Sequence, residues 1–252
     1  MTHRIGFSTG ATFGFRDPLS ITGIQDMPMG GQPPNPVEIC FNNTNDLPAF
    51  RNLAIDLAQN EAALKMLSSS VALSIHAPAN GVRYGDNEIS EAVLDAVWKM
   101  MQVVRIDRVV FHPDVIDHDG WELFRYGRFP GLALENSDSR KPFGRSVDDM
   151  AELIDRLRCG LVLDLAHCFM IDPTMRSAYD FIDRLGDRIV EVHLSGVGES
   201  EGSHVPLFKT GQDIILDPLR LIPTDIPVIV ESACAGSDDL EAEYRYISRL
   251  LP

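Results

Sequence analysis

The chain has 252 residues, which exceeds the usual size of one domain but is typical of an eight-stranded α/β barrel folded as a single unit. Its formal net charge of −15 at pH 7 makes the surface repel polyanions, so duplex nucleic acid is a disfavoured partner unless a locally basic groove exists. No run of about 18 apolar residues is present, which argues against a membrane span.

The four cysteines, Cys40, Cys159, Cys168 and Cys234, are scattered with no Cys-x-x-Cys spacing. The first residues, Met-Thr-His-Arg-Ile-Gly, lack the apolar core of a signal peptide. We therefore expect a reducing, cytoplasmic location. The sequence carries no signal for an oligomeric state.

Apolar runs of the β type alternate with segments of helical period along the whole chain. The predicted strands cover residues 4–9, 37–42, 71–77, 108–112, 132–135, 161–164, 190–193 and 228–231. The predicted helices between and after them cover residues 47–67, 91–104, 147–157, 175–185, 214–222 and 240–251. Within the second of these helices, Trp98 and the Met100-Met101 pair are expected to fill the core.

Two crossovers depart from this regular pattern. The first, residues 10–36, is rich in Gly and Pro and has no convincing helical period. The crossover between the fourth and fifth strands is brief, with one short helix expected near residues 121–126. No linker, internal repeat or low-complexity block interrupts the alternation. The sequence therefore predicts a single (β/α)8 TIM-barrel domain over residues 1–252, with a weak first crossover helix.

The predicted strands repeatedly end on a side chain that can bind a metal ion. Six of them end on such a residue, namely His76, His112, Glu135, Asp164, His193 and Glu231. His167 follows the sixth strand by three residues, and His204 lies in the loop after the seventh. In α/β barrels these strand ends converge on one centre. Mixtures of imidazole and carboxylate suit Zn²⁺, Mn²⁺ or Fe²⁺, so the pattern predicts a metal cluster.

A simpler interpretation applies to each histidine taken alone, because a hydrogen-bonded core or rim histidine is the commoner case. His3 and His118 lie in polar sequence and are expected to be solvated. The other five histidines all lie at strand ends or in the following loops. Isolated carboxylates are costly at the ends of buried strands unless they are paired or metal-bound, so the combined set favours a metal centre.

The order of these motifs resembles that of the endonuclease IV and xylose isomerase-like TIM barrels over nearly the whole chain. The motifs are Ser-Ile-His-Ala-Pro at 74–78, Val-Phe-His-Pro at 110–113, Leu-Glu-Asn at 134–136, Leu-Asp-Leu-Ala-His-Cys-Phe at 163–169, Val-His-Leu at 192–194, His-Val-Pro at 204–206 and Val-Glu-Ser at 230–232. The resemblance implies two or three divalent ions per chain, with zinc as the first choice and manganese or iron as alternatives.

The resemblance also implies which residues hold each ion. The first ion would be held by His76, His112 and Glu135. Glu135 would bridge to a second ion, which the ligands Asp164, His193 and Glu231 would complete. The third ion of this family uses the residue matching His167 and an Asp-x-His pair in the loop after the seventh strand. This chain has Gly202-Ser203-His204 there, so the aspartate is missing unless Glu199 or Glu201 substitutes for it.

Four further charged residues are predicted to lie near the centre. Glu191 has the same side-chain parity as His193, and we expect it to be a buried acid satisfied by a neighbour. Glu38 faces similarly from the second strand, toward substrate or the polar interior of the barrel. Lys209 and Arg145 lie in loops at the expected mouth and could hold an anion.

Two enzymatic hypotheses fit these residues. The first is metal-dependent hydrolysis of a phosphoester, favoured because His76 and His112 complete a first metal site. The alternative is a metal-dependent sugar or sugar-phosphate isomerase or epimerase, with Glu135 and Glu231 as ligands and bases. The expected catalytic residues are Glu135, Glu231 and His167. Short loops and an acidic surface suit a small-molecule substrate better than duplex DNA. A third hypothesis is a metal-binding barrel without enzymatic activity.

Overall fold

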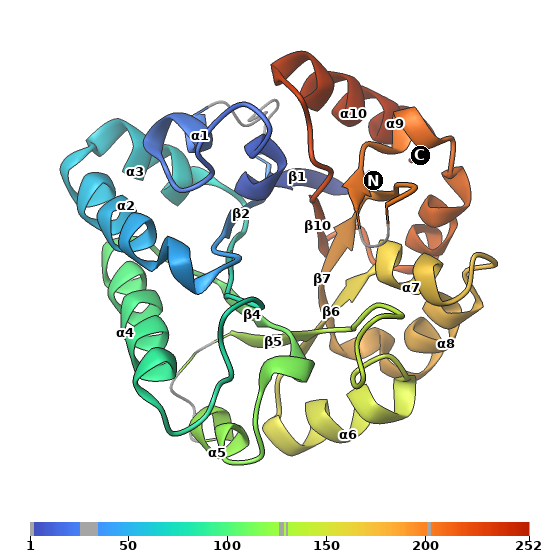
Figure 1. The fold of residues 1–252 in the computed structure, drawn as a ribbon. Coiled ribbons are helices and arrows are strands. Elements are labelled where there is room, and N and C mark those ends of the chain that lie inside the picture. Colours follow the sequence, from blue (N-terminus) through green and yellow to red (C-terminus); the bar gives the residue numbers. More distant parts are fainter. Residues whose placement is uncertain (1–2, 26–34, 126–128, 130, 201–202, 252) are drawn as a thin grey trace.

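The computed structural model describes residues 3–25, 35–125, 129, 131–200 and 203–251. Eight parallel strands close into a barrel in the order β1-β10-β7-β6-β5-β4-β3-β2 (Figure 1). They are β1 Arg4–Ser8, β2 Val37–Cys40, β3 Leu73–His76, β4 Arg108–Phe111, β5 Leu132–Glu135, β6 Gly160–Asp164, β7 Ile189–Leu194 and β10 Pro227–Val230. The predicted (β/α)8 barrel is confirmed.

Helices surround the barrel on its outside (Figure 1). They are α1 Ile21–Gln25, α2 Leu47–Gln59, α3 Glu61–Ser69, α4 Glu88–Val103, α5 Gly120–Arg125, α6 Val147–Leu157, α7 Leu165–Ile171, α8 Arg176–Leu185, α9 Leu207–Thr210 and α10 Ser237–Leu250. Turns of 3-10 helix lie at residues 9–12, 44–46, 113–115, 186–188 and 213–221. The short α1 and α5 agree with the weak first crossover helix and the brief crossover between the fourth and fifth strands.

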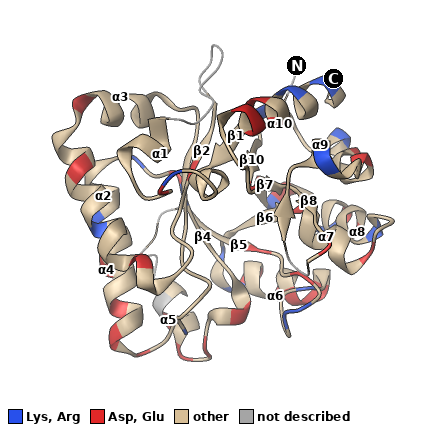
Figure 2. Cartoon of the chain, turned by 45° about the horizontal axis from the view of Figure 1, so that its top comes forward, with Lys and Arg blue, Asp and Glu red and all other residues tan. Residues whose placement is uncertain are grey.

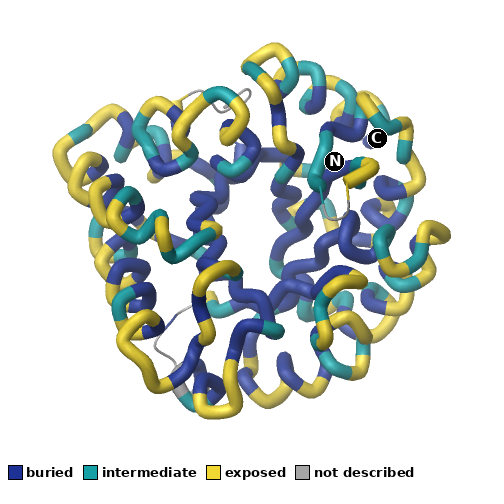
Figure 3. The backbone as a smooth tube through the Cα atoms, viewed as in Figure 1, coloured by how far each residue is buried: buried dark blue, intermediate teal, exposed yellow. Residues whose placement is uncertain are grey.

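The barrel wall is buried on both faces (Figure 3). Apart from a few strand ends, the strand residues are buried, because one face of the barrel contacts the helices and the other fills the barrel interior. The four cysteines are all buried and free. No helix in the described part of the chain has the length and apolar character needed to cross a membrane.

Local sequence explains two helices that the periodicity did not predict. The single helix expected over residues 47–67 is wrong, because the chain forms α2 and α3 with a break at Asn60, whose side chain accepts a hydrogen bond from the Ala63 amide at 3.0 Å. Directly after β6, the short helix α7 begins, and the Asp164 carboxylate accepts a hydrogen bond from the His167 amide at 2.7 Å. Asp164 therefore ends a strand and caps a helix at once.

Two residues lie in surroundings that the sequence did not predict. Trp98 was expected in the core, but 48 % of its surface is exposed, whereas Val97 and Met100 of the same helix are buried. Trp98 is one residue removed from the buried face of α4, and each residue turns a helix by about 100°. His3, expected to be solvated, is partly buried, and its Nε2 atom donates to the carbonyl of Leu219 at 2.9 Å.

A small two-stranded sheet follows β7 and carries His204. Its strands are β8 Gly196–Val197 and β9 His204–Val205, and they pair in antiparallel fashion. The fully buried Glu243 of α10 fixes the chain just beyond this sheet, since its carboxylate accepts hydrogen bonds from the amide of Leu207 at 2.8 Å and from that of Phe208 at 3.2 Å. The same carboxylate binds the Ser232 hydroxyl at 2.8 Å, beside Glu231. Glu243 thus connects two segments that end at the barrel mouth.

We expect Glu243→Ala to destabilise the fold by about 2 to 4 kcal/mol, because it leaves two backbone N–H groups and one hydroxyl without their acceptor. The free energy of unfolding, measured by urea denaturation, checks this. The control is Glu241→Ala on the same helix, where an exposed carboxylate pairs only with Arg245 four residues on, and little change is expected. Equal losses in the two variants would contradict the role of Glu243.

Candidate metal centre

The structure brings together acidic and imidazole side chains from six strand ends. His76, Glu135, Asp164 and His193 are the last or near-last residues of β3, β5, β6 and β7, while His112 and Glu231 directly follow β4 and β10. All six lie at the carboxyl end of the barrel, because the strands are parallel. The side chains of Glu135, Asp164 and His193 are almost completely shielded from solvent.

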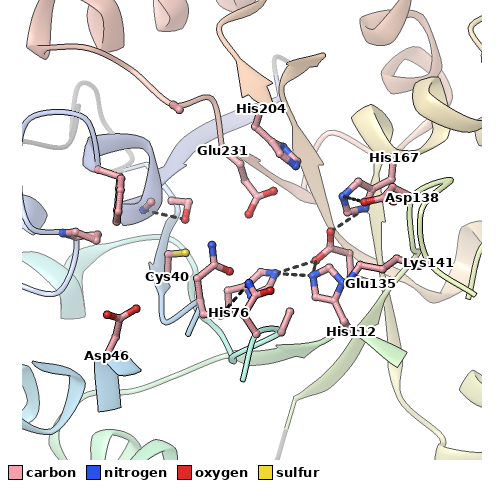
Figure 4. A pocket seen from close by; sticks show the side chains of 18 of the residues that line it. Cys40, Asp46, His76, His112, Glu135, Asp138, Lys141, His167, His204 and Glu231 are labelled. Atoms are coloured by element: carbon pink, nitrogen blue, oxygen red, sulfur yellow. Dashed lines mark hydrogen bonds and ion pairs between the residues drawn. The ribbon is translucent and has the colours of Figure 1, made fainter. Parts of the chain in front are cut away.

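Glu135 lies at the centre of this cluster (Figure 4). Its Oε2 atom is 3.0 Å from Nε2 of His76, 3.3 Å from Nε2 of His112 and 3.6 Å from Nδ1 of His193. Its other oxygen, Oε1, is 3.2 Å from Nδ1 of His167. One carboxylate therefore faces four imidazoles, and its two oxygen atoms are directed to different sides of the cluster.

Two groups of side chains share Glu135 and could each hold a divalent ion. In one group, ligand atoms of His76, Glu135 and His193 lie within 4.8 Å of one another. In the other, ligand atoms of Glu135, Asp164, His193 and Glu231 meet the same limit. Nε2 of His112 lies 3.2 Å from Nε2 of His76, next to the first group.

Unsatisfied polar atoms indicate that the cluster is built for a cation. Oδ2 of Asp164 and Nδ1 of His193 are buried and have no hydrogen-bond partner among the described residues. Buried polar atoms are rarely left without partners, and carboxylates that converge out of contact with water repel one another. The mixed nitrogen and oxygen donor set suits Zn²⁺, Mn²⁺ or Fe²⁺. The residues present therefore fit a divalent metal centre.

A second buried layer lies behind His193. Oε2 of Glu38 and Oε1 of Glu191 are 3.2 Å and 3.3 Å from its Nε2 atom. On the other side, Nη1 of Arg108 is 3.5 Å from Oε2 of Glu191. The Nε2–H of His193 is thus directed at two carboxylates, so the Nδ1 atom faces Glu135 and Glu231. Such partners fix the tautomer and the orientation of a ligating histidine.

The charges within the cluster shift its pKa values strongly. Burial alone would lower the pKa of His76, but the hydrogen bond that His76 donates to Glu135 and the charge of Glu38 raise it to about 9. Burial raises the pKa of Glu231 to about 8, although His193 opposes the shift. Burial would also raise the pKa of Glu135, yet His112 and His193 hold it well below its usual range. Without a metal ion, protons therefore neutralise part of the cluster.

His167 and His204 lie at the edge of the cluster. Nδ1 of His167 donates to the carbonyl of Asn136 at 2.8 Å, and Nδ1 of His204 is 2.8 Å from the Ser195 hydroxyl. The two rings are 5.6 Å apart between centroids. Within the described residues, neither ring belongs to a convergent group of three ligands.

The loop aspartate expected beside His204 has no substitute among the described residues of that loop. Glu201 and Gly202 lie outside the described residues, and Glu199 is exposed. Another loop supplies a carboxylate beside His167, because Oδ2 of Asp138 is 3.9 Å from Nε2 of His167. The sequence analysis missed Asp138. Its spacing was a usable signal, since it follows Glu135 by three residues, as His167 follows Asp164.

A cavity of about 570 Å³ opens above the cluster. Its wall includes His76, His112, Glu135, His167, His204, Glu231, Phe13, Leu19, Cys40, Asp46, Asp138, Arg140 and Lys141. Lys209 and Arg145, expected to hold an anion at the mouth, do not line it. Lys209 pairs with Asp239, and Nη1 of Arg145 donates to the Ser139 carbonyl at 3.3 Å. The cations of this wall are Arg140 and Lys141.

The chain combines a closed (β/α)8 barrel with an acidic and imidazole cluster at its carboxyl end, and known structures share its fold. Endonuclease IV from Thermus thermophilus is 17 % identical with a TM-score of 0.59, and each chain is covered to 98 %. The 3-keto-D-glucoside 4-epimerase from E. coli is 15 % identical with a TM-score of 0.62, also with 98 % of each chain covered.

A further T. thermophilus protein, whose crystals were soaked with zinc chloride, is 18 % identical with a TM-score of 0.58, over 99 % of this chain and 98 % of its own. No protein-family model and no curated protein matches the sequence. The resemblance to the endonuclease IV and xylose isomerase-like barrels is thus confirmed at the level of the fold.

We expect Glu135→Gln to lower the affinity for zinc by at least about 100-fold, because both candidate groups lose a shared anionic ligand. Competition with a chromophoric chelator measures the affinity, and elemental analysis of the purified protein measures the content. Asp46→Asn is the control, since Asp46 lines the same cavity but belongs to neither group, and its metal content should be normal. Unchanged zinc affinity in Glu135→Gln would contradict the central position of this residue.

Metal affinity should rise with pH up to about 9. His76, with a pKa of about 9, and Glu231, with a pKa of about 8, both hold protons at neutral pH in the metal-free protein. A divalent ion must displace these protons, so raising the pH favours binding and binding at pH 7 releases protons. Calorimetric titration in two buffers of different ionisation enthalpy measures this release. Affinity that is independent of pH between about 6 and 9 would contradict it.

Proposed function

We propose that the protein is a divalent-metal-dependent hydrolase of phosphoesters of small molecules. The observation that carries this proposal is the position of Glu135, shared between a group on the β3 side and a group on the β6 side of the cluster. A carboxylate whose two oxygens point to different neighbours can bridge a pair of ions, and paired ions are typical of phosphoester hydrolysis.

The distances support the ligand sets that the family resemblance implies. His76, His112 and Glu135 would hold the first, and Asp164, His193 and Glu231 with Glu135 the second. When bound, such ions polarise a phosphoryl oxygen and lower the pKa of water. Zinc is the first choice, with manganese or iron as alternatives, on the mixed nitrogen and oxygen donor set.

Three side chains of the cavity have roles that depend on their positions. Glu231 is the most exposed acid of the cluster, with 15 % of its side chain accessible, so it can exchange a proton with a substrate or with water. His167 presents Nε2 to the cavity side because its Nδ1 is fixed on a backbone carbonyl. Lys141 adds a positive charge at the wall next to His112.

The charge distribution supports a small substrate over duplex DNA. The net charge of −15 repels a polyanion, and α4 carries the exposed acidic residues Glu88, Glu91 and Asp95 (Figure 2). A cavity of about 570 Å³ is of the size that takes a small molecule. Although endonuclease IV shares the fold, fold likeness at 17 % identity does not carry its substrate to this chain.

Sugar isomerisation or epimerisation is the second candidate, and the position of Glu231 favours it. A carboxyl with a raised pKa of about 8 that lines the cavity is suited to move a proton on and off a carbon atom. Glu135 and Glu231 would then be the two acids of the reaction. A single ion suffices for that chemistry, so His112 is less readily explained.

His112→Ala separates the two candidates. We expect the wild-type protein to contain two ions per chain and to hydrolyse p-nitrophenyl phosphate or bis(p-nitrophenyl) phosphate, and the variant to lose one ion and at least about 100-fold in kcat/KM. His118→Ala, which changes an exposed histidine, is the control and should behave as wild type. Full retention of activity in His112→Ala, or deuterium uptake from D2O into a sugar catalysed with one ion per chain, would favour the isomerase.

A further inference from the structure

A fixed positive charge lies in the cavity wall beside His167. Asp138 is buried, and its carboxylate accepts hydrogen bonds from the Arg140 amide at 2.7 Å and from Nε of Arg140 at 3.1 Å, and it also binds Nη2 of that residue. The Arg140 side chain remains 37 % exposed and lines the cavity. Asp138 thus holds the guanidinium at the edge where Nε2 of His167 faces the same carboxylate at 3.9 Å.

The buried charges balance with two divalent ions. Three carboxylates belong to the candidate metal groups around Glu135, and Glu38 and Glu191 lie behind them. Arg108 is the one cation in contact with this set among the described residues, which leaves a net charge of minus four. Two divalent ions neutralise it. A third would place two uncompensated positive charges in a buried site, because Asp138 is already neutralised by Arg140.

Lys141 provides a second cation on the same side. Its Nζ atom is 3.1 Å from Oδ2 of Asp114, and Oδ1 of Asp114 is 3.9 Å from Nδ1 of His112. In Figure 4, Asp138 and Lys141 lie on the side of the cavity where His112 and His167 lie, while Cys40 and Asp46 lie opposite. Arg140 and Lys141 are consecutive residues of the loop after β5, so one loop supplies both cations.

The opposite wall carries an apolar patch. Phe13, Pro18 and Leu19 line the cavity from the segment after β1, and 74 % of the Phe13 surface is exposed. In the closed ring β1 is four strands away from β5, so the two loops face each other across the mouth. A molecule lying over the metal groups would meet cations at one end and an aromatic ring at the other.

We propose that Arg140 and Lys141 form an anion-binding subsite that replaces a third metal ion, and that its ligand is the phosphate group of a small substrate whose ring or apolar part contacts Phe13. The inference rests on the proposed function, because it assigns the substrate class of that site. Asp138 accepts hydrogen bonds from Nε and Nη2 of Arg140, which fixes the orientation of the guanidinium, and arginine suits phosphate oxygens as partners. The chain would then bind two ions, and Arg140 would bind the phosphate in place of a third ion.

Binding of inorganic phosphate to the zinc-loaded protein, measured by calorimetry, tests the subsite, and elemental analysis counts ions in each variant. We expect Arg140→Gln and Lys141→Gln each to weaken phosphate binding by about tenfold while two ions remain. Arg145→Gln is the matched control, since Arg145 belongs to the same loop but donates to Ser139 and does not line the cavity. Its phosphate affinity should equal that of the wild type.

Two results would overturn the subsite. One is a wild-type protein with three ions of which Asp138→Asn loses one, because Asp138 would then be a metal ligand. The other is phosphate affinity that is unchanged in both Arg140→Gln and Lys141→Gln. Failure of the proposed function looks different: loss of phosphate affinity in Arg140→Gln without phosphoester hydrolysis by the wild type would support the subsite and refute the hydrolase.

Discussion

The burial of carboxylates around Glu135 is the constraint on which the rest of the structure depends. Acidic side chains that converge within 4.8 Å, away from water, repel one another and lose hydration at the same time. Only positive charge makes such a cluster tolerable. The chain provides part of it as imidazoles facing Glu135 and as Arg108 behind Glu191, and the remainder must come from protons or from bound cations.

The need to balance these buried charges links the candidate metal centre to the stability of the barrel. The residues of the cluster are also strand ends and helix caps, as Asp164 shows by ending β6 and capping α7. Their backbone positions are therefore fixed by the barrel before any ion binds. A site of this kind is preorganised, so the free energy gained if a metal ion binds would not be spent on ordering loops. Glu243 extends this order to the segments that carry His204 and Glu231.

The structural features of this chain differ in how well the sequence predicts them, because they depend on different kinds of sequence pattern. Apolar runs that end on a polar residue predict both the barrel and the convergence of its strand ends. The sequence therefore identifies the residues at these strand ends one by one. The break at Asn60 and the exposure of Trp98 depend on a local cap and on a small rotation about a helix axis, which the apolar periodicity does not resolve. The Asp138–Arg140 pair depends on a loop with no period at all.

The choice between a hydrolase and an isomerase depends more on the positions of charged side chains than on the fold. Barrels of this shape include an endonuclease IV and a sugar epimerase, so the backbone does not choose between them. The placement of its positive charges bears on this choice. His112 lies beside His76 and extends the cluster toward β4. Arg140 is paired with Asp138, the carboxylate that a third ion would need as a ligand. The proposed active site would have its fixed cations at the β5 side and an aromatic side chain at the β1 side, so it would discriminate by the distance between an anionic group and a ring. Duplex DNA, whose phosphates repeat along a rigid double helix, presents no such single pair of features to a cavity of about 570 Å³.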